Sequence, residues 1–210
     1  MNKKNREIEL KLQVTEEAAW ESLKNQIKTM PGAGGYEKIS LAANYFDTED
    51  GFLHKEHLAY RTRKEGAQWV ATIKGGGSVC NGLHKRAEWN LCVDDGRPDL
   101  RVFLQTDVDQ AILRELGNKE LISIVQTEFI REVVILHIDG SEIEIAMDRG
   151  SIMAGKNTAP ILEIELELKA GHEDAVLKLG DYFMTQFPVK RSDKSKFLRG
   201  LELKNQSVKL

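Results

Sequence analysis

The most regular feature of this chain is a strict alternation of apolar and polar residues, which recurs in about eight segments. A period of two is typical of a strand with one apolar and one polar face. Because short turns separate most of these segments, antiparallel pairing is favoured, and the expected class is α+β, mainly β. The pattern predicts strands at residues 5–14, 40–48, 56–64, 67–75, 82–93, 125–137, 141–149 and 160–169.

Four further segments carry the signals of helices. Caps and acidic first turns at their starts, and proline or glycine beyond several of their ends, predict helices at residues 15–29, 106–116, 172–186 and 192–203. Thr106 or Asp107 is the expected cap of the second. The run Gly75-Gly76-Gly77-Ser78 lacks the spacing and the following lysine of a P-loop, so we interpret it as a flexible hairpin connection.

The polar faces of the predicted strands carry charge in an unusual pattern. Glu7, Glu9 and Lys11 share one face of the first strand, and Arg61 and Arg63 share one face of the third. A solvated sheet face explains any one strand, but like charges two residues apart, about 7 Å, repel one another. The repetition therefore favours a charged ligand between the strands. The same parity gives polar faces with Lys74, Arg86, Glu88, Arg131, Glu142, Glu144, Asp148, Glu163, Glu165, Glu167 and Lys169.

A closed sheet accounts for both kinds of face. If eight antiparallel strands form a barrel with the charged faces inward, helices can pack on its apolar outside and the lumen becomes a tunnel. Carboxylates in the lumen are hard ligands for Mg²⁺ or Mn²⁺, and arginine and lysine match phosphate oxygens. A polyphosphate with a divalent metal uses both. The sequence has no motif for a serine, cysteine or histidine nucleophile, and we interpret the five histidines as surface or loop residues.

Composition adds limits on location and partners. The chain has 30 Lys+Arg against 33 Asp+Glu, so no basic excess attracts nucleic acid or an anionic membrane, and its length suits one domain over residues 1–210. Without an apolar run near the ~20 residues of a membrane span, and with a polar start, we expect a cytoplasmic protein. Cys80 and Cys92 are expected to be free thiols. The oligomeric state stays open.

The sequence EIELK at residues 7–11 is similar to the Glu-x-Glu-x-Lys signature of the CYTH superfamily, the triphosphate tunnel metalloenzymes. Later motifs resemble that family in the same order, namely YFDT at 45–48, RTR at 61–63, WVATIK at 69–74, HKRAEW at 84–89, EIAMDRG at 144–150, LEIELELK at 162–169 and SKFLRG at 195–200. The resemblance is greatest to the bacterial inorganic triphosphatase branch and implies metal-dependent hydrolysis of tripolyphosphate. Thiamine triphosphatase, class IV adenylate cyclase and a noncatalytic polyphosphate or nucleotide sensor are the alternatives.

The resemblance also implies roles for the matching positions. Binding of the triphosphate is expected from Lys11, Arg61, Arg63, Lys74, Arg86, Arg131 and Lys196, with Lys194 left open beside Lys196. Mg²⁺ or Mn²⁺ is expected to be held by Glu7, Glu9, Glu144, Asp148, Glu163 and Glu165, with Glu88 in support. As catalytic residues we expect Glu9, which would orient the attacking water, and Lys11, which in its neutral form would accept a proton. Tyr45, Phe46 and Asp47 are interpreted as packing and turn residues.

Overall fold

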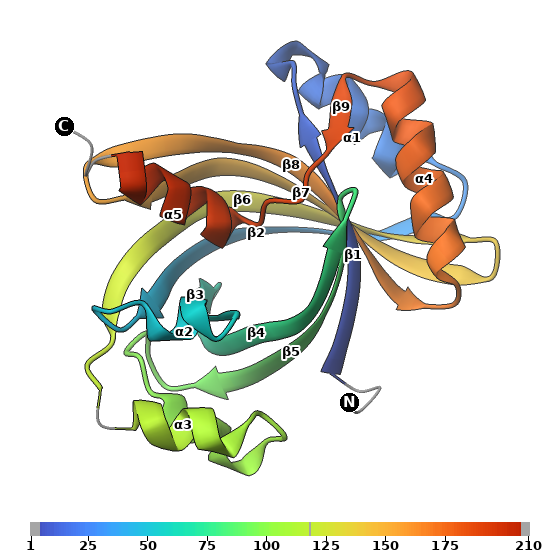
Figure 1. The fold of residues 1–210 in the computed structure, drawn as a ribbon. Helices are drawn as coiled ribbons and strands as arrows, with labels where there is room; N and C mark the ends of the chain where they lie inside the picture. The colour runs from blue at the N-terminus through green and yellow to red at the C-terminus, as the bar shows by residue number, and fades with distance from the viewer. Residues whose placement is uncertain (1–4, 118, 207–210) are drawn as a thin grey trace.

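A computed structural model describes residues 5–117 and 119–206, and it contains a closed antiparallel barrel of eight strands (Figure 1). The predicted barrel is confirmed: the strands run in the order β5-β4-β3-β2-β6-β7-β8-β1, and β1 closes the ring by pairing with β5. The ring comprises β1 (Arg6–Val14), β2 (Ala33–Asp47), β3 (Leu58–Glu65), β4 (Gln68–Cys80), β5 (Leu83–Val93), β6 (Ile122–Ile138), β7 (Ser141–Ala154) and β8 (Asn157–Ala170).

Helices cover most of the apolar outer face of the barrel. The helices α1 (Trp20–Thr29) and α4 (Glu173–Gln186) lie side by side (Figure 1) and bury a cluster that includes Leu10, Leu136 and Ile145. On the other side, α3 (Gln110–Leu116) and the 3-10 helix η3 (Leu100–Gln105) bury Tyr60 and Phe103. Burial of each such side chain stabilises the fold by about 1.5–3 kcal/mol. Nothing helical in the described part of the chain is long and apolar enough to cross a bilayer.

The last helix, α5 (Lys196–Gln206), has a different place. It packs on β6, β7 and β8 from the inner side, because Phe197 lies in one cluster with Tyr45 and Phe129, which face the lumen like Arg131. Figure 1 shows α5 along the curved ends of these strands. A Cβ at Gly200 would lie 2.3 Å from a methyl of Val125, so this approach depends on glycine. The helix therefore begins, at Lys196, inside the barrel.

Several strands extend beyond the predicted bounds. β2 begins at Ala33 instead of residue 40, because the polar, glycine-containing start of this strand pairs with β6 without showing alternation. The expected hairpin at Gly75–Ser78 is wrong: these residues continue β4, with a bulge between Gly75 and Gly77. Gly77 has a φ of 115°, and a Cβ there would lie 1.9 Å from the carbonyl oxygen of Lys85, so only glycine fits.

Helix boundaries differ for local reasons. The 3-10 turn η2 (Glu17–Ala19) precedes α1, which begins at Trp20 and not at residue 15. Asp109, whose carboxylate accepts from the N–H of Ala111, caps α3 in place of Thr106 or Asp107. α5 begins at residue 196 instead of 192, because the preceding residues bond to the barrel. The short helix α2 (Phe52–Lys55) and the strand β9 (Val189–Arg191), which pairs with β1, are too short for a periodic signal.

Candidate active site

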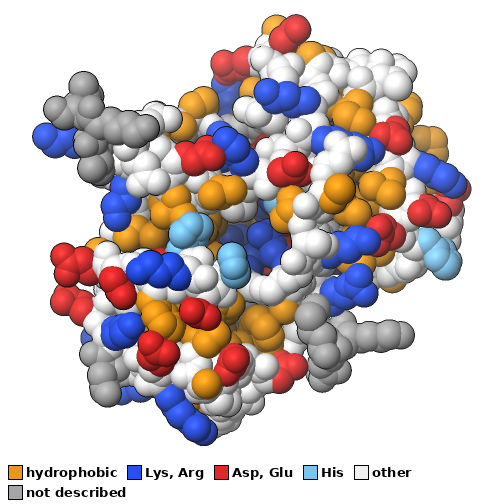
Figure 2. Space-filling model, in the orientation of Figure 1, with side chains coloured by type: hydrophobic (Ala, Val, Ile, Leu, Met, Phe, Trp, Pro, Cys, Tyr) orange, Lys and Arg blue, Asp and Glu red, His pale blue; other side chains and the backbone are white. Residues whose placement is uncertain are grey.

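The barrel encloses a cavity of about 210 Å³ with a charged wall. Figure 2, which views the molecule in the orientation of Figure 1, shows a hollow with Lys and Arg side chains at its floor. Eight cations and six carboxylates line the cavity, and the carboxylates of Asp148 and Glu163 lie directly behind its wall, in contact with the lining cation Lys196. The cations are Lys11, Arg61, Arg63, Lys74, Arg86, Arg131, Lys169 and Lys196, and the carboxylates are Glu7, Glu9, Glu88, Glu144, Glu165 and Glu167.

Three carboxylates form an acidic triad at the side of the cavity. Asp148 of β7 lies opposite Glu163 of β8, and Glu165 follows two residues later on the same face. One oxygen from each lies within 4.8 Å of the others, and all three residues are buried. Mg²⁺ takes oxygen ligands at about 2.0–2.1 Å in an octahedron, which separates opposite ligands by about 4 Å. The triad therefore offers the donor type that Mg²⁺ or Mn²⁺ prefers, in a group compact enough to share one ion.

Four cations contact this triad, and two of them contact more than one of its members. Nζ of Lys196 lies 2.7, 2.5 and 2.9 Å from Asp148, Glu163 and Glu165. Arg131 donates to Asp148 from Nε at 2.7 Å and to Glu165 from Nη2 at 2.5 Å. Burial alone would lower the pKa of Lys196, but the three carboxylates outweigh it and raise the pKa. The Lys196 ammonium thus lies where a metal ion would contact the triad.

The residues of β1 lie beside the triad. Glu7 accepts hydrogen bonds from Lys74 at 2.7 Å and from Arg86 at 2.9 Å, and Arg86 also donates to Glu9 at 2.5 Å. Lys11 pairs with Glu165 and lies 3.1 Å from Glu9. Burial lowers the pKa of Lys11, but Glu165 and Glu9 outweigh it, so the pKa is raised. These contacts favour the ammonium form of Lys11, and its role as a proton acceptor in the neutral form stays a prediction.

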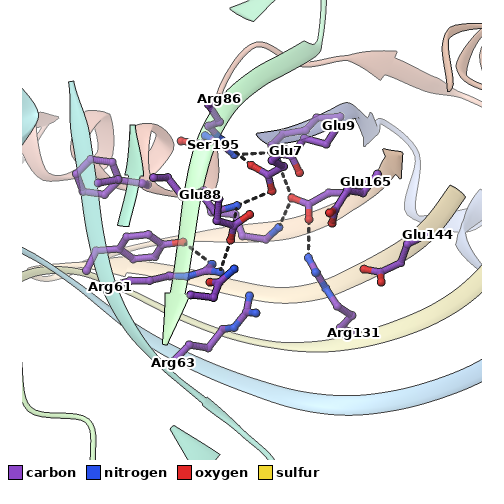
Figure 3. A pocket seen from close by; sticks show the side chains of 18 of the residues that line it. Glu7, Glu9, Arg61, Arg63, Arg86, Glu88, Arg131, Glu144, Glu165 and Ser195 are labelled. Carbon is purple, nitrogen blue, oxygen red and sulfur yellow. Dashed lines mark hydrogen bonds and ion pairs between the residues drawn. The ribbon is translucent and has the colours of Figure 1, made fainter. Parts of the chain in front are cut away.

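Arg61 and Arg63 of β3 approach the cavity from the opposite side (Figure 3). Arg61 is buried, its contact with Glu88 is long at 4.0 Å, and its Nε has no hydrogen-bond partner among the described residues. Arg63 donates to Glu65 at 2.6 Å, and burial, followed by the neighbouring Arg61 and Arg131, lowers its pKa to about 10. A buried donor without a partner is costly, so this side of the cavity is suited to an anionic ligand.

All of the predicted site residues lie at the cavity or, for Asp148 and Glu163, directly behind its wall. The open choice between two lysines is settled, because Lys194 is half exposed and pairs with Glu202, whereas Lys196 reaches the lumen. The predicted free thiols are confirmed, since Cys80 and Cys92 are both unpaired and exposed.

Four contributors to the site were not predicted as functional. Lys169 bridges Glu144 at 3.3 Å and Glu167 at 2.9 Å, and its parity with the glutamates of β8 was the available signal. Arg199 of α5 donates to Glu163 at 2.8 Å. The cavity is also lined by Tyr45 and Phe129, of which Tyr45 had been interpreted as packing and accepts from Arg61 at 3.4 Å. One histidine, His84, is buried and not at the surface as expected.

Comparison with known proteins agrees with this architecture. The sequence model of the CYTH domain matches residues 5–201. Over 165 residues the chain is 31% identical to an inorganic triphosphatase of Haemophilus influenzae, and the match covers 79% of this chain and 46% of the relative. This chain thus spans about half the length of that relative.

Solved structures share the fold at low sequence identity. The protein HpAC1 from Hippeastrum, described as an adenylyl cyclase candidate with a dominant triphosphatase activity, has a TM-score of 0.64 at 20% identity, over 92% of this chain and 95% of that one. PH1819 from Pyrococcus horikoshii has a TM-score of 0.57 at 19% identity, over 93% and 98%. Likeness at this level concerns the fold alone.

Proposed function

Because this chain belongs to the CYTH domain family, we propose that it is a metal-dependent triphosphatase, which hydrolyses inorganic tripolyphosphate to phosphate and pyrophosphate. The observation that carries the proposal is the combination of a buried carboxylate triad with eight cations around one small cavity. The similarity to an inorganic triphosphatase supports it.

The size of the cavity favours a small substrate. Its 210 Å³ lies below the roughly 300–1,000 Å³ that pockets for drug-sized ligands occupy. Two of its aromatic rings are already stacked on each other, since the ring centroids of Tyr45 and Phe197 are 5.3 Å apart. An organic group on the triphosphate would therefore have to remain outside the charged part of the lumen.

Substrate binding is assigned to the cations, which differ in how free they are. Arg61 has a buried donor without a partner among the described residues and would make the first contact with phosphate oxygens, joined by Arg63, whose carboxylate partner is Glu65. Lys11, Lys74, Arg86, Arg131 and Lys196 are each paired with carboxylates and would exchange part of these contacts for phosphate. Holding three phosphates at fixed positions supplies most of what phosphoryl transfer requires of a protein.

We propose that Asp148, Glu163 and Glu165 hold the divalent ion, Mg²⁺ or Mn²⁺, and that Glu7, Glu9 and Glu144 complete the acidic surroundings. The ion, when bound, neutralises charge on the phosphate oxygens and favours attack by water. Lys196 would leave the triad and so become available to the substrate.

Glu9 is our candidate for orienting the attacking water. It is almost fully buried at the cavity wall and already accepts from Arg86, which would keep its carboxylate in place. Lys11 is assigned to binding, because Glu9 and Glu165 stabilise its ammonium form.

The test offers purified protein, with Mg²⁺ or Mn²⁺, tripolyphosphate, thiamine triphosphate and ATP in parallel, while phosphate, pyrophosphate and cyclic AMP are measured. Tripolyphosphate should be hydrolysed fastest, and the reaction should release phosphate and pyrophosphate in equal amounts. Chelation of the metal should abolish turnover. Cyclic AMP as the main product from ATP would contradict the proposal, and so would tight binding of tripolyphosphate without any turnover.

A further inference from the structure

The segment that leads into α5 is attached to the barrel at the point where the ring closes. β1 pairs with β5 through residue 10 and with β9 from residue 12, so Lys11 lies at the junction. There the N–H of Ser192 donates to the carbonyl oxygen of Lys11 at 3.0 Å, and the N–H of Gly82 donates to Asp193 at 2.6 Å. Residues 192 and 193 are therefore held between β1 and the start of β5.

His84 makes the third contact with this segment. Its Nε2 lies 3.1 Å from the carbonyl oxygen of Ser192, and the residue is 1% exposed. A carbonyl oxygen can only accept, so Nε2 carries a hydrogen, and in the neutral ring Nδ1 is then the unprotonated nitrogen. Nδ1 is buried and has no hydrogen-bond partner among the described residues. Of the two nitrogens of the buried ring, Nε2 thus makes a hydrogen bond, to Ser192, and Nδ1 makes none to the described residues.

The surroundings of His84 favour its neutral form. Burial, with the nearby positive charge of Lys11, lowers the pKa of His84 to about 4. His84 lies directly opposite Glu9 in the β1–β5 pairing and two residues before Arg86. A neutral donor at this position can hold Ser192 without placing a further cation beside Lys11 and Arg86.

Ser192 is four residues before Lys196, whose ammonium contacts all three carboxylates of the triad. We propose that His84 is a positioning residue, which fixes Ser192 through its Nε2–H and thereby sets the start of α5 so that Lys196 reaches the lumen. As far as it concerns substrate, this inference rests on the proposed function.

The test compares two side chains that differ by one methylene. In His84→Gln the amide nitrogen can take the place of Nε2, whereas in His84→Asn it is too short to reach Ser192. A third variant, His84→Leu, removes the donor altogether. Each of the three His84 variants is made in the wild-type protein and in the Lys196→Met variant. The control is His137→Gln, because His137 is exposed. The readouts are the tripolyphosphate dissociation constant without metal, from calorimetry, and amide hydrogen exchange of residues 192–199.

We expect His84→Asn and His84→Leu to weaken tripolyphosphate binding roughly 5- to 30-fold and to speed exchange in residues 192–199, while exchange in α1 and α4 stays unchanged. His84→Gln should stay within about threefold of wild type. In the Lys196→Met background the same substitutions of His84 should change the tripolyphosphate dissociation constant by less than about twofold. Equal losses in both backgrounds, or His84→Gln as weak as His84→Asn, would overturn the role of His84.

The outcomes also separate this inference from the proposed function. If the wild-type protein neither binds nor hydrolyses tripolyphosphate, the proposed function fails, and the exchange data alone then decide on His84. If wild-type turnover is as proposed and neither affinity nor exchange responds to His84→Asn, the inference fails and the proposed function stands. Should His84→Leu not fold, the polar pair Gln and Asn still gives the comparison.

Discussion

Cations that line the same cavity differ in what they can offer a ligand. Nζ of Lys196 has three carboxylate partners within 2.9 Å, whereas Arg61 has one long ion pair of 4.0 Å, a hydrogen bond of 3.4 Å to Tyr45 and a buried Nε without a partner among the described residues. Lys196 is thus already paired within the protein, whereas the Nε of Arg61 is a donor that a bound ligand could pair with. A charge count of the lumen alone would treat the two as equal.

Arg61→Ala should therefore affect binding and stability in opposite directions. Loss of a charge-assisted contact in a desolvated site weakens tripolyphosphate binding by about 1.5–3 kcal/mol, or roughly 10- to 150-fold. Because the unpartnered donor is also removed, the free energy of unfolding should stay the same or rise. Calorimetry and urea unfolding measure the two effects, with the exposed Arg97→Ala as control. A variant that binds normally but unfolds more easily would show that Arg61 is structural.

Lys196→Met should separate metal binding from substrate binding. Removal of the ammonium leaves three buried carboxylates without their shared cation, so Mn²⁺ alone should bind more tightly, by roughly tenfold or more. Tripolyphosphate should bind more weakly, because one of its cations is lost. Titrations of Mn²⁺ and of tripolyphosphate, each without the other, test this. Weaker Mn²⁺ binding in the variant would remove the triad as the metal site.

Among the elements, α1 is fixed to the outside of the barrel by charge as well as by its apolar face. Glu132 of β6 is nearly buried and accepts from Lys28 at 2.6 Å, Lys24 at 2.9 Å and the hydroxyl of Tyr36 at 2.9 Å. Burial raises the pKa of Glu132, but these hydrogen bonds outweigh it and lower the pKa from 4.5 to about 2.

The stability that Glu132 supplies should depend on pH. A carboxyl group with a lowered pKa in the folded state stabilises fully above its unfolded pKa, here 4.5, and its contribution is lost as the pH falls towards 2. Glu132→Gln should thus lower the free energy of unfolding by about 1–3 kcal/mol at pH 7, and the difference from wild type should shrink between pH 4.5 and 2. Urea unfolding at pH 7, 5, 4 and 3 measures it. A difference independent of pH would mean that packing, and not charge, is responsible.

The sequence pattern predicted the strands and the division between their charged and apolar faces, because side-chain parity in a strand is independent of its exact length. Closure of the sheet into a barrel with the charges inward was a hypothesis at that point, which the family resemblance then supported. The pattern did not predict β9, which has three residues, or the early part of β2, whose glycines hide the alternation. The bulge at Gly77 was missed because a glycine run fits a turn equally well. His84 was missed because its partner, Ser192, is distant in the sequence and joins it through a backbone carbonyl.

For the molecule as a whole, ligand binding should appear as increased stability. Anything that binds the folded protein alone stabilises it by about 2.7 kcal/mol at 100 times its dissociation constant, which for a chain of this size raises Tm by roughly 5–10 °C. Because the carboxylates of the triad are already paired with Lys196, whereas Arg61 has a buried Nε without a partner among the described residues, tripolyphosphate should raise Tm more than Mg²⁺ alone, and thermal scans in each will show the order. A larger rise in Tm with Mg²⁺ alone than with tripolyphosphate would contradict this expectation.

The closure of the ring at β1 has a consequence for how the protein is made. β1 pairs with β5, β8 and β9, all of which come much later in the sequence. The pairing of β1 can therefore be completed only after these segments have been synthesised. Contacts so far apart in sequence are slow to form, because a large loop must close first. During synthesis Glu7, Glu9 and Lys11 leave the ribosome before Lys196, and the edges of β1 stay unpaired in between. A lumen that can bind phosphate is thus a late product of folding, and an incomplete chain presents charged strands without a site.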